Sequence, residues 1–156
     1  VVITVPFANH AAILNEIEDA VAGKIVVETT VPLMPPKVGT VQLPAAGSAA
    51  LFTHDMLGAK AEVVSAFHNV AAKKLHDGQS MDCDILVCGN KRAAREVVIG
   101  LVEAIGMRGI HAGPIANSAA TEALTSVLIS INRNYKVAGA GLVITGDLTA
   151  SEPESA

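Results

Sequence analysis

Short apolar runs alternate along this chain with longer stretches in which apolar residues recur every three or four positions. The short runs predict strands that are buried on both faces, and the periodic stretches predict helices that pack over them. The predicted strands are 1–5, 24–28, 61–67, 83–87, 108–112 and 142–145. The predicted helices are 9–22, 49–57, 69–75, 91–105 and 117–133. This alternation predicts an α/β fold built on a parallel sheet.

Local signals refine the predicted helices. Ser48 follows a stretch rich in Pro and Gly and is predicted to cap the helix that starts after it, and Asn9 can cap the first helix. The helix 91–105 is predicted to bury an apolar stripe. That stripe consists of Val97, Val98, Leu101, Val102 and Ile105.

The polar stretch 76–80 is the best candidate for a linker. It divides the chain into a first unit at 1–77 and a smaller C-terminal α/β domain at 78–146. The last residues, 147–156, are polar and are predicted to form a disordered tail.

The composition supports a packed core without aromatic residues. Hydrophobic residues make up 51% of the 156 and aromatics only 3%, so Val, Ile, Leu and Ala must fill the interior. The 15 acidic and 11 basic residues give a net charge of −4, and no basic face with interleaved aromatics is visible, which argues against nucleic acid as a partner. No apolar run reaches the length of a membrane span, so we expect no membrane association.

The two cysteines, Cys83 and Cys88, lie five residues apart in one strand-like run. Their side chains should therefore point to opposite faces, which prevents a disulfide between them or a shared metal. Buried free thiols are the better interpretation, and they suit a reducing cytoplasm.

Three places combine polar side chains with the end of a predicted strand. The first strand ends at Thr4-Val5-Pro6, just before Asn9 at a helix start, where free amides and the helix dipole suit a polar ligand. The third strand ends at His68-Asn69, and a Gly-Pro turn after the fifth strand leads to Asn117-Ser118. In open α/β sheets, ligands bind at the carboxyl ends of the strands, so all three places are candidate sites.

Each place also has a plainer interpretation. Asn9 can be an ordinary cap beside a surface His10, His68 can be a structural histidine, and Asn117-Ser118 can be a helix cap. The other histidines, at positions 54, 76 and 111, are expected to have no partner. No residue stands at metal-ligand spacing from His68, so we predict no metal site. A cleft lined by amides, main chain and one histidine suits hydride transfer between bound cofactors better than hydrolysis.

At these positions the chain resembles the NADPH-dependent F420 reductases, also called F420-dependent NADP oxidoreductases. The similarity covers nearly all of 1–146, and its order and spacing are more specific than any one motif. The matching stretches are 4–7, 24–27 with Val31-Pro32, 63–72, 87–89, 111–114 with Asn117-Ser118, and 122–125 through 131–133.

The resemblance implies an oxidoreductase that moves a hydride between NADPH and the deazaflavin coenzyme F420. It implies a Rossmann-like NADP-binding part, a smaller domain that closes the deazaflavin cleft, a homodimer and a cytoplasmic location. On the NADP side it implies contacts from Thr4, Val5, Pro6, Asn9, Val31 and Ala72. On the deazaflavin side it implies contacts from His68, Asn69, Asn117, Ser118 and Ala140. His68 would orient or polarise the deazaflavin ring, and no acid or base would be required for the hydride itself.

One departure from the family concerns the N-terminal side. The family's first βαβ unit, with its Gly-rich pyrophosphate turn, has no counterpart in this sequence. We therefore expect an N-terminally truncated chain that binds NADP poorly and is inactive on its own. Two alternatives stay open at this point: a non-catalytic Rossmann-like binding module, and an NADP-dependent reductase with another acceptor, such as a metal ion or an imine.

Overall fold

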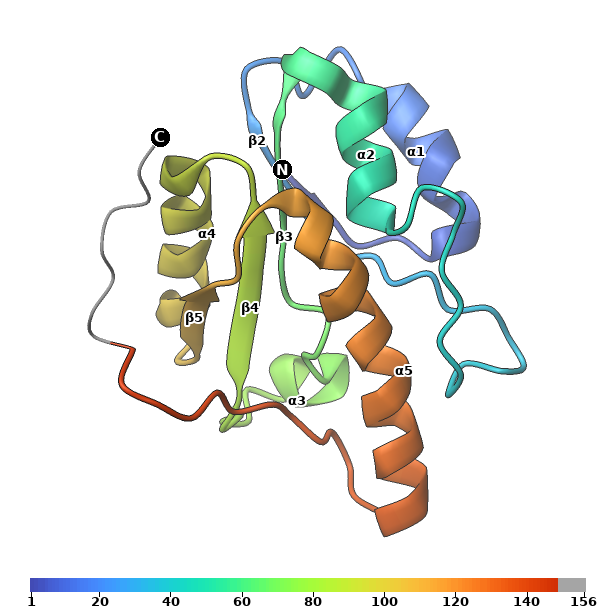
Figure 1. The fold of residues 1–156 in the computed structure, drawn as a ribbon, viewed down its shortest axis with the longest axis vertical. Helices are drawn as coiled ribbons and strands as arrows, with labels where there is room; N and C mark the ends of the chain where they lie inside the picture. The colour runs from blue at the N-terminus through green and yellow to red at the C-terminus, as the bar shows by residue number, and fades with distance from the viewer. Residues whose placement is uncertain (149–156) are drawn as a thin grey trace.

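In the computed structural model, residues 1–148 are described, and they form one five-stranded sheet flanked by helices (Figure 1). The strands lie in chain order across the sheet: β1 (Val2–Ile3), β2 (Ile25–Glu28), β3 (Glu62–Ser65), β4 (Asp84–Gly89) and β5 (Arg108–His111). The α-helices are α1 (His10–Ile17), α2 (Ala49–Leu57), α3 (Ala72–His76), α4 (Arg92–Ala104) and α5 (Ser118–Tyr135). Three short 3₁₀ turns are η1 (Phe7–Asn9), η2 (Gly58–Lys60) and η3 (Ile115–Asn117). The predicted α/β class is confirmed.

Two hydrophobic cores lie on opposite faces of the sheet. Val26 and Val63 face the first core, with side chains from α1, α2 and η3, whereas Val27 and Val64 face the second core, with side chains from α4. Successive strand residues point to opposite faces, so each apolar strand serves both cores. Figure 1 accordingly shows α4 on one side of the sheet and α1 and α2 on the other.

The sheet is parallel except at one pair. β1, β2 and β3 run parallel, as do β4 and β5, but β3 and β4 are antiparallel. The only helix between them is the five-residue α3, which lies beyond the carboxyl end of β3 and does not cross a face of the sheet (Figure 1). The chain therefore reverses direction at this point. Only Cys88 and Gly89 of β4 pair with β3, so the first part of β4 extends beyond the carboxyl end of β3.

Two predictions about regular structure are wrong. The segment 142–145 forms no strand, because only the Leu142 carbonyl joins the main chain of β4, accepting from the Asp84 amide at 2.7 Å. In α4 only Val98 and Val102 of the predicted stripe are buried. Val97, Leu101 and Ile105 are 55%, 47% and 45% exposed. These three recur every four residues about 100° around the helix from the buried pair, and the sheet covers only one face.

The predictions for Ser48 and for the two cysteines are confirmed. The Ser48 hydroxyl caps α2 by accepting from the Leu51 amide at 2.9 Å. Cys83 and Cys88 are both buried free thiols.

The boundary at 77/78 stays a prediction, and the strands on its two sides, β3 and β4, belong to one sheet. Within 1–148 no helix is long and apolar enough to cross a membrane. Most of the predicted tail, residues 149–156, lies outside the described part of the chain.

Candidate functional site

The carboxyl ends of β1 and β2 bring the first predicted site residues together. Thr4, Val5 and Pro6 continue from β1, and Val31 follows two threonines after β2. The Thr29 hydroxyl donates to the Ile3 carbonyl at 2.7 Å, and the Thr30 hydroxyl donates to the Val5 carbonyl at 3.4 Å. These bonds fix the two strand ends side by side, so four of the residues assigned to the NADP side by resemblance lie together there: Thr4, Val5, Pro6 and Val31.

Beneath this edge lies a buried polar cluster that the sequence analysis missed. The His10 imidazole lies 2.7 Å from the Glu28 carboxylate, and the Thr53 hydroxyl donates to the same oxygen at 2.7 Å. The Thr30 amide donates to the other Glu28 oxygen at 2.9 Å. Burial opposes the charge on Glu28, but the bonds from His10, Thr30 and Thr53 together hold its pKa below the ordinary value.

The interpretation of His10 as a surface residue is therefore wrong, since it is only 1% exposed. Asn9 makes no side-chain capping bond, so its predicted role as a cap is also wrong. The 3₁₀ turn η1 precedes α1, and it turns His10 inward between the rings of Phe7 and Phe52. Asn9 itself is exposed.

The backbone at the end of β3 has an uncommon conformation. Phe67 has φ of 68°, in the left-handed region that bulky residues rarely adopt. Phe67 turns the chain immediately after Ala66 and places His68 against α5. Such strain persists only where the surrounding structure enforces it, and it is concentrated at ligand sites.

His68 is buried, and its ring is neutral at physiological pH. Desolvation lowers the pKa of His68 to about 4, against the opposing effects of the Glu28 charge and main chain. Nδ1 lies 3.5 Å from the Thr121 hydroxyl, which is a long contact. Nε2 has no hydrogen-bond partner in the part of the chain that the structure describes. An unpaired buried nitrogen costs about 1–3 kcal/mol.

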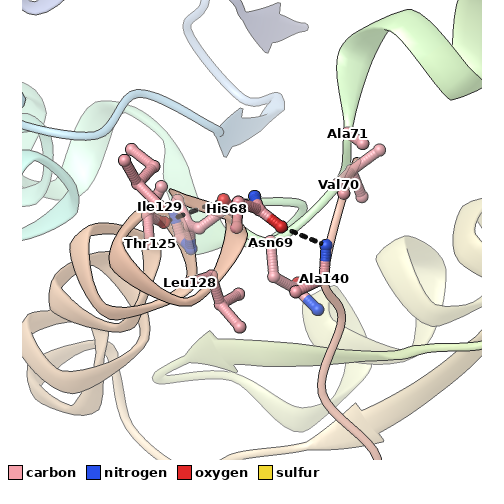
Figure 2. Close-up of a pocket in the computed structure, with 10 residues that line it drawn as sticks. His68, Asn69, Val70, Ala71, Thr125, Leu128, Ile129 and Ala140 are labelled. Carbon is pink, nitrogen blue, oxygen red and sulfur yellow. Dashed lines mark hydrogen bonds between the residues drawn. The ribbon is translucent and has the colours of Figure 1, made fainter. Parts of the chain in front are cut away.

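A pocket of about 170 Å³ lies next to His68 (Figure 2). We call it the His68 pocket. α5 contributes its apolar floor and two polar side chains, and the chain after β3 and the segment after α5 contribute the remaining wall. Its lining residues are His68, Asn69, Val70, Ala71, Thr125, Leu128, Ile129, Asn132, Gly139 and Ala140.

Hydrogen bonds fix the walls of the His68 pocket. The Thr125 hydroxyl donates to the His68 carbonyl at 2.8 Å, which ties the strained turn to α5. The Asn132 side chain accepts from the Ala140 amide at 2.7 Å, a bond marked in Figure 2. The side-chain amide of Asn69 donates to the Asp84 carbonyl at 2.8 Å, so this side chain is directed toward β4. The pocket is thus preformed, mostly apolar and bordered by a few polar groups, as ligand sites usually are.

A second pocket, of about 310 Å³, adjoins the first. The two share Asn69, Ala71 and Gly139, and the second extends between α3 and the start of β4. Its polar lining comes from Lys74, Ser80 and Asp82.

Three of the five residues assigned to the deazaflavin side, His68, Asn69 and Ala140, line the His68 pocket. Asn117 and Ser118 do not. The side-chain amide of Asn117 donates to the Ala112 carbonyl at 2.7 Å. Ser118 is buried, and its hydroxyl lies 2.7 Å from the hydroxyl of Ser65. Their assignment to a ligand stays a prediction, as does that of Ala72, which begins α3 on the surface.

Two histidines that were expected to be alone have partners. The Arg95 guanidinium donates to His111 Nδ1 at 3.2 Å, and the side chains of Asn90 and His54 meet at 3.5 Å. Neither pair lines the His68 pocket. Within residues 1–148 no group of three or more His, Cys, Asp or Glu residues could hold a metal ion.

The pocket residues that sequence reasoning missed come mainly from α5. Thr125, Leu128, Ile129 and Asn132 recur every three or four residues and therefore share one face of the helix. The signal was two polar positions within an otherwise apolar stripe. The cluster of Glu28, His10 and Thr53 offered no such signal, because its members are far apart in the sequence.

Comparisons with known proteins identify the family of this chain. The chain is 38% identical over 150 residues to the F420-dependent NADP reductase of Methanocaldococcus jannaschii, covering 93% of this chain and 67% of the relative. The enzyme of the same name from Methanothermobacter marburgensis is 32% identical over 92% of this chain and 67% of its own length. The one from Methanothermobacter thermautotrophicus is 34% identical over 93% of this chain and 65% of its own length. The chain thus spans about two thirds of the length of these relatives. No family model matches it.

Solved structures show the same fold. A crystal structure from Arthrobacter sp. FB24, provisionally described as an F420-dependent NADP reductase, has a TM-score of 0.78 at 26% identity, over 93% of this chain and 68% of that one. A Sinorhizobium meliloti protein of unassigned function, SMa0349, has a TM-score of 0.58 at 21% identity, over 76% and 58%, and shares the fold alone. On the identity and coverage of the first relative, the chain belongs to the family of F420-dependent NADP reductases.

Proposed function

We propose that this protein transfers a hydride between NADP(H) and the deazaflavin coenzyme F420. The names of the curated relatives support this assignment. The observation that carries it is His68, a buried, neutral imidazole with an unpaired Nε2, beside a preformed pocket at the ligand-binding edge of the sheet. The cofactors supply the redox chemistry when bound, and in the direction of F420 reduction one hydride leaves NADPH and one proton comes from solvent.

On the NADP side, the proposed contacts are Thr4, Val5, Pro6, Asn9, Val31 and Ala72. The ends of β1 and β2 would position the nicotinamide part, because their main chains are fixed to each other by Thr29 and Thr30. The buried Glu28 cluster supports this edge from below by fixing the turn after β2 to α1 and α2. Its role is therefore to hold the geometry of the binding edge.

On the deazaflavin side, the His68 pocket would receive part of the ring system. A neutral imidazole can donate one hydrogen bond and accept another, so Nε2 can bond to a ring carbonyl and orient it. The apolar floor formed by Leu128 and Ile129 suits a flat ring and excludes water from it. Asn69 and Ala140 border the same pocket, and Asn117 and Ser118 remain proposed contacts for a more distant part of the cofactor.

His68 offers a direct test of this site. NADPH would be added to F420 and the purified protein, and the loss of the deazaflavin absorbance would be followed. Both the 156-residue chain and the chain extended upstream as far as its coding sequence runs would be used. We expect rapid bleaching with the extended chain and a loss of at least tenfold in kcat/KM on replacing His68 by Leu.

The matched control is His76→Leu, because His76 is an exposed histidine at the end of α3 and lines neither pocket. Equal rates for the two variants would contradict the assignment of His68. NADPH binding without bleaching would indicate a reductase with another acceptor, and the absence of NADPH binding would indicate a non-catalytic binding module.

We also propose that the protein is a cytoplasmic homodimer. The exposed stripe of Val97, Leu101 and Ile105 on α4 supports self-association, because contiguous apolar side chains on a surface are typical of interfaces. Light scattering should give twice the chain mass for the wild type and a smaller mass for Leu101→Glu. A monomeric wild type would contradict the proposal. Fractionation of the source cells would test the location.

A further inference from the structure

The segment after α5 forms a wall of both pockets without belonging to either core. We call residues 139–144 the strap. Gly139 and Ala140 line the His68 pocket, and Gly139 and Gly141 line the second pocket. The strap has no regular secondary structure (Figure 1). None of its residues is fully buried. Polar contacts, not core packing, must therefore hold it in place.

At the start of the strap, the Ala140 amide donates to Asn132 and Lys74 donates to the Gly139 carbonyl. At its other end, the contacts of Ile144 converge on an ion pair between Asp84 and Arg108 at the start of β4 and β5. The Arg108 guanidinium donates to both carboxylate oxygens, at 2.7 and 2.6 Å, and to the Ile144 carbonyl at 2.9 Å. The Asp84 carboxylate in turn accepts from the Ile144 amide at 2.6 Å. The hydrogen bonds from Arg108 keep the pKa of Asp84 below its ordinary value, so the carboxylate stays charged. The pair thus binds both main-chain groups of Ile144.

Two glycines let the strap approach the walls of the pockets. A Cβ on Gly139 would lie 2.8 Å from the Cβ of Ala71, and a Cβ on Gly141 would lie 2.5 Å from that of Cys83. Both distances are shorter than real contacts between such atoms. The strap therefore lies directly against α3 and β4, at the point where the two pockets adjoin.

The volumes indicate that the strap divides one larger site. The His68 pocket, at about 170 Å³, is smaller than the roughly 300–1,000 Å³ of usual cofactor and ligand sites. The neighbouring pocket lies on the other side of Gly139 and shares Asn69 and Ala71 with it. If the strap moves outward, the two pockets join and a ring with an attached polar chain can enter, and the strap then closes on the bound ligand.

We propose that the strap is a lid on the deazaflavin site, and that Asp84 and Arg108 are positioning residues that hold it closed. The identity of the ligand rests on the proposed function, but the lid itself does not. Binding and release of the ligand require the contacts with Ile144 to open, and the ion pair sets how often they do. Neither residue touches the ligand.

Hydrogen exchange without ligand tests the lid. In the wild type, the amides of 140–144 should exchange at least tenfold faster than those of Ile85–Val87 in β4, because the strap can open without unfolding the sheet. Arg108→Gln should speed exchange in the strap about tenfold or more, and Arg108→Lys, which keeps the charge, should restore part of the protection. The matched control is Arg92→Gln, which removes an exposed ion pair with Glu96 on α4.

Equal strap exchange in the Gln variants of Arg108 and Arg92 would overturn the proposal. So would strap amides that exchange as slowly as those of β4. F420 titration gives the functional readout: Arg108→Gln should raise the Kd for F420 several-fold and leave that for NADPH unchanged. If the wild type does not bind F420 at all, the proposed function fails, while the exchange comparison still decides whether the strap is a lid.

Discussion

Glu122 gives a stability prediction whose sign and size follow from the structure. This residue of α5 is completely buried, and its carboxyl group accepts from the Ala49 and Ala50 amides at 2.7 and 3.0 Å. It thus joins α5 to the first turn of α2. Desolvation raises the pKa of Glu122 to about 7, against the effect of the two amide bonds. We predict that Glu122→Gln changes how the free energy of unfolding depends on pH.

The magnitude follows from proton linkage. A carboxyl group with a pKa of about 7 in the folded state and 4.5 in the unfolded state binds protons more tightly when the protein is folded. Its contribution to stability is therefore complete below pH 4.5 and is lost as the pH rises through 7. Between pH 5 and pH 8 the loss amounts to about 2–3 kcal/mol. The Gln variant cannot titrate, so its stability relative to wild type should improve by about this amount.

Urea unfolding at pH 5, 6, 7 and 8 would measure the effect. Far-UV circular dichroism is the suitable signal, because the chain has no Trp and one Tyr. The difference between variant and wild type must be used, since burial lowers the pKa of His68 to about 4 and gives a slope of opposite sign between pH 4 and 6.5. Glu62→Gln, at a partly exposed ion pair with Lys91, is the control and should show no such trend.

The opposite trend would refute this reasoning. If wild type gains stability over Glu122→Gln as the pH rises, the carboxyl group is ionised in the folded protein. The two amides and the dipole of α2 would then outweigh the cost of burial.

Three further predictions concern Glu28, Gly141 and Gly100. Glu28→Gln should cost about 3 kcal/mol at pH 7, because it breaks a buried pair with His10, and the cost should shrink as the pH falls below 4.5; urea unfolding at pH 7 and pH 4 would check this. Gly141→Ala should weaken F420 binding, measured by titration, because the added Cβ clashes with Cys83 and displaces the strap; unchanged affinity would contradict the role of the strap. Gly100→Ala in α4 meets no neighbouring atom and should raise stability by roughly 0.5–1 kcal/mol; a lower melting temperature would contradict this.

Much of the fold could be predicted because apolar periodicity reports which faces are buried. The strands around Val26-Val27 and Val63-Val64 were clear for this reason, and the sequence also located Ser48 as a cap. Strand direction was harder to predict, because the reversal between β3 and β4 depends on a five-residue helix. In α4, periodicity alone could not show that the sheet covers only one of two adjacent apolar stripes.

The candidate site was predictable where chemistry follows a strand end. His68 and Asn69 stand directly after an apolar run, and both line the pocket. The pairing of Glu28 with His10 was not predictable, because a strand end and a helix start 18 residues apart meet only in the folded chain. Asn132 was missed for a similar reason, since its partner Ala140 belongs to a segment that was expected to precede a strand.

Transfer of deuterium would test the central claim most directly. NADPH with both C4 hydrogens of the nicotinamide replaced by deuterium would be incubated with F420 and the protein in ordinary water, and the reduced deazaflavin would be analysed by mass spectrometry. The account predicts that the deuterium passes directly to the deazaflavin, because one site holds both cofactors. Reduced deazaflavin without the label, or no reduction at all by a protein that binds both cofactors, would contradict it.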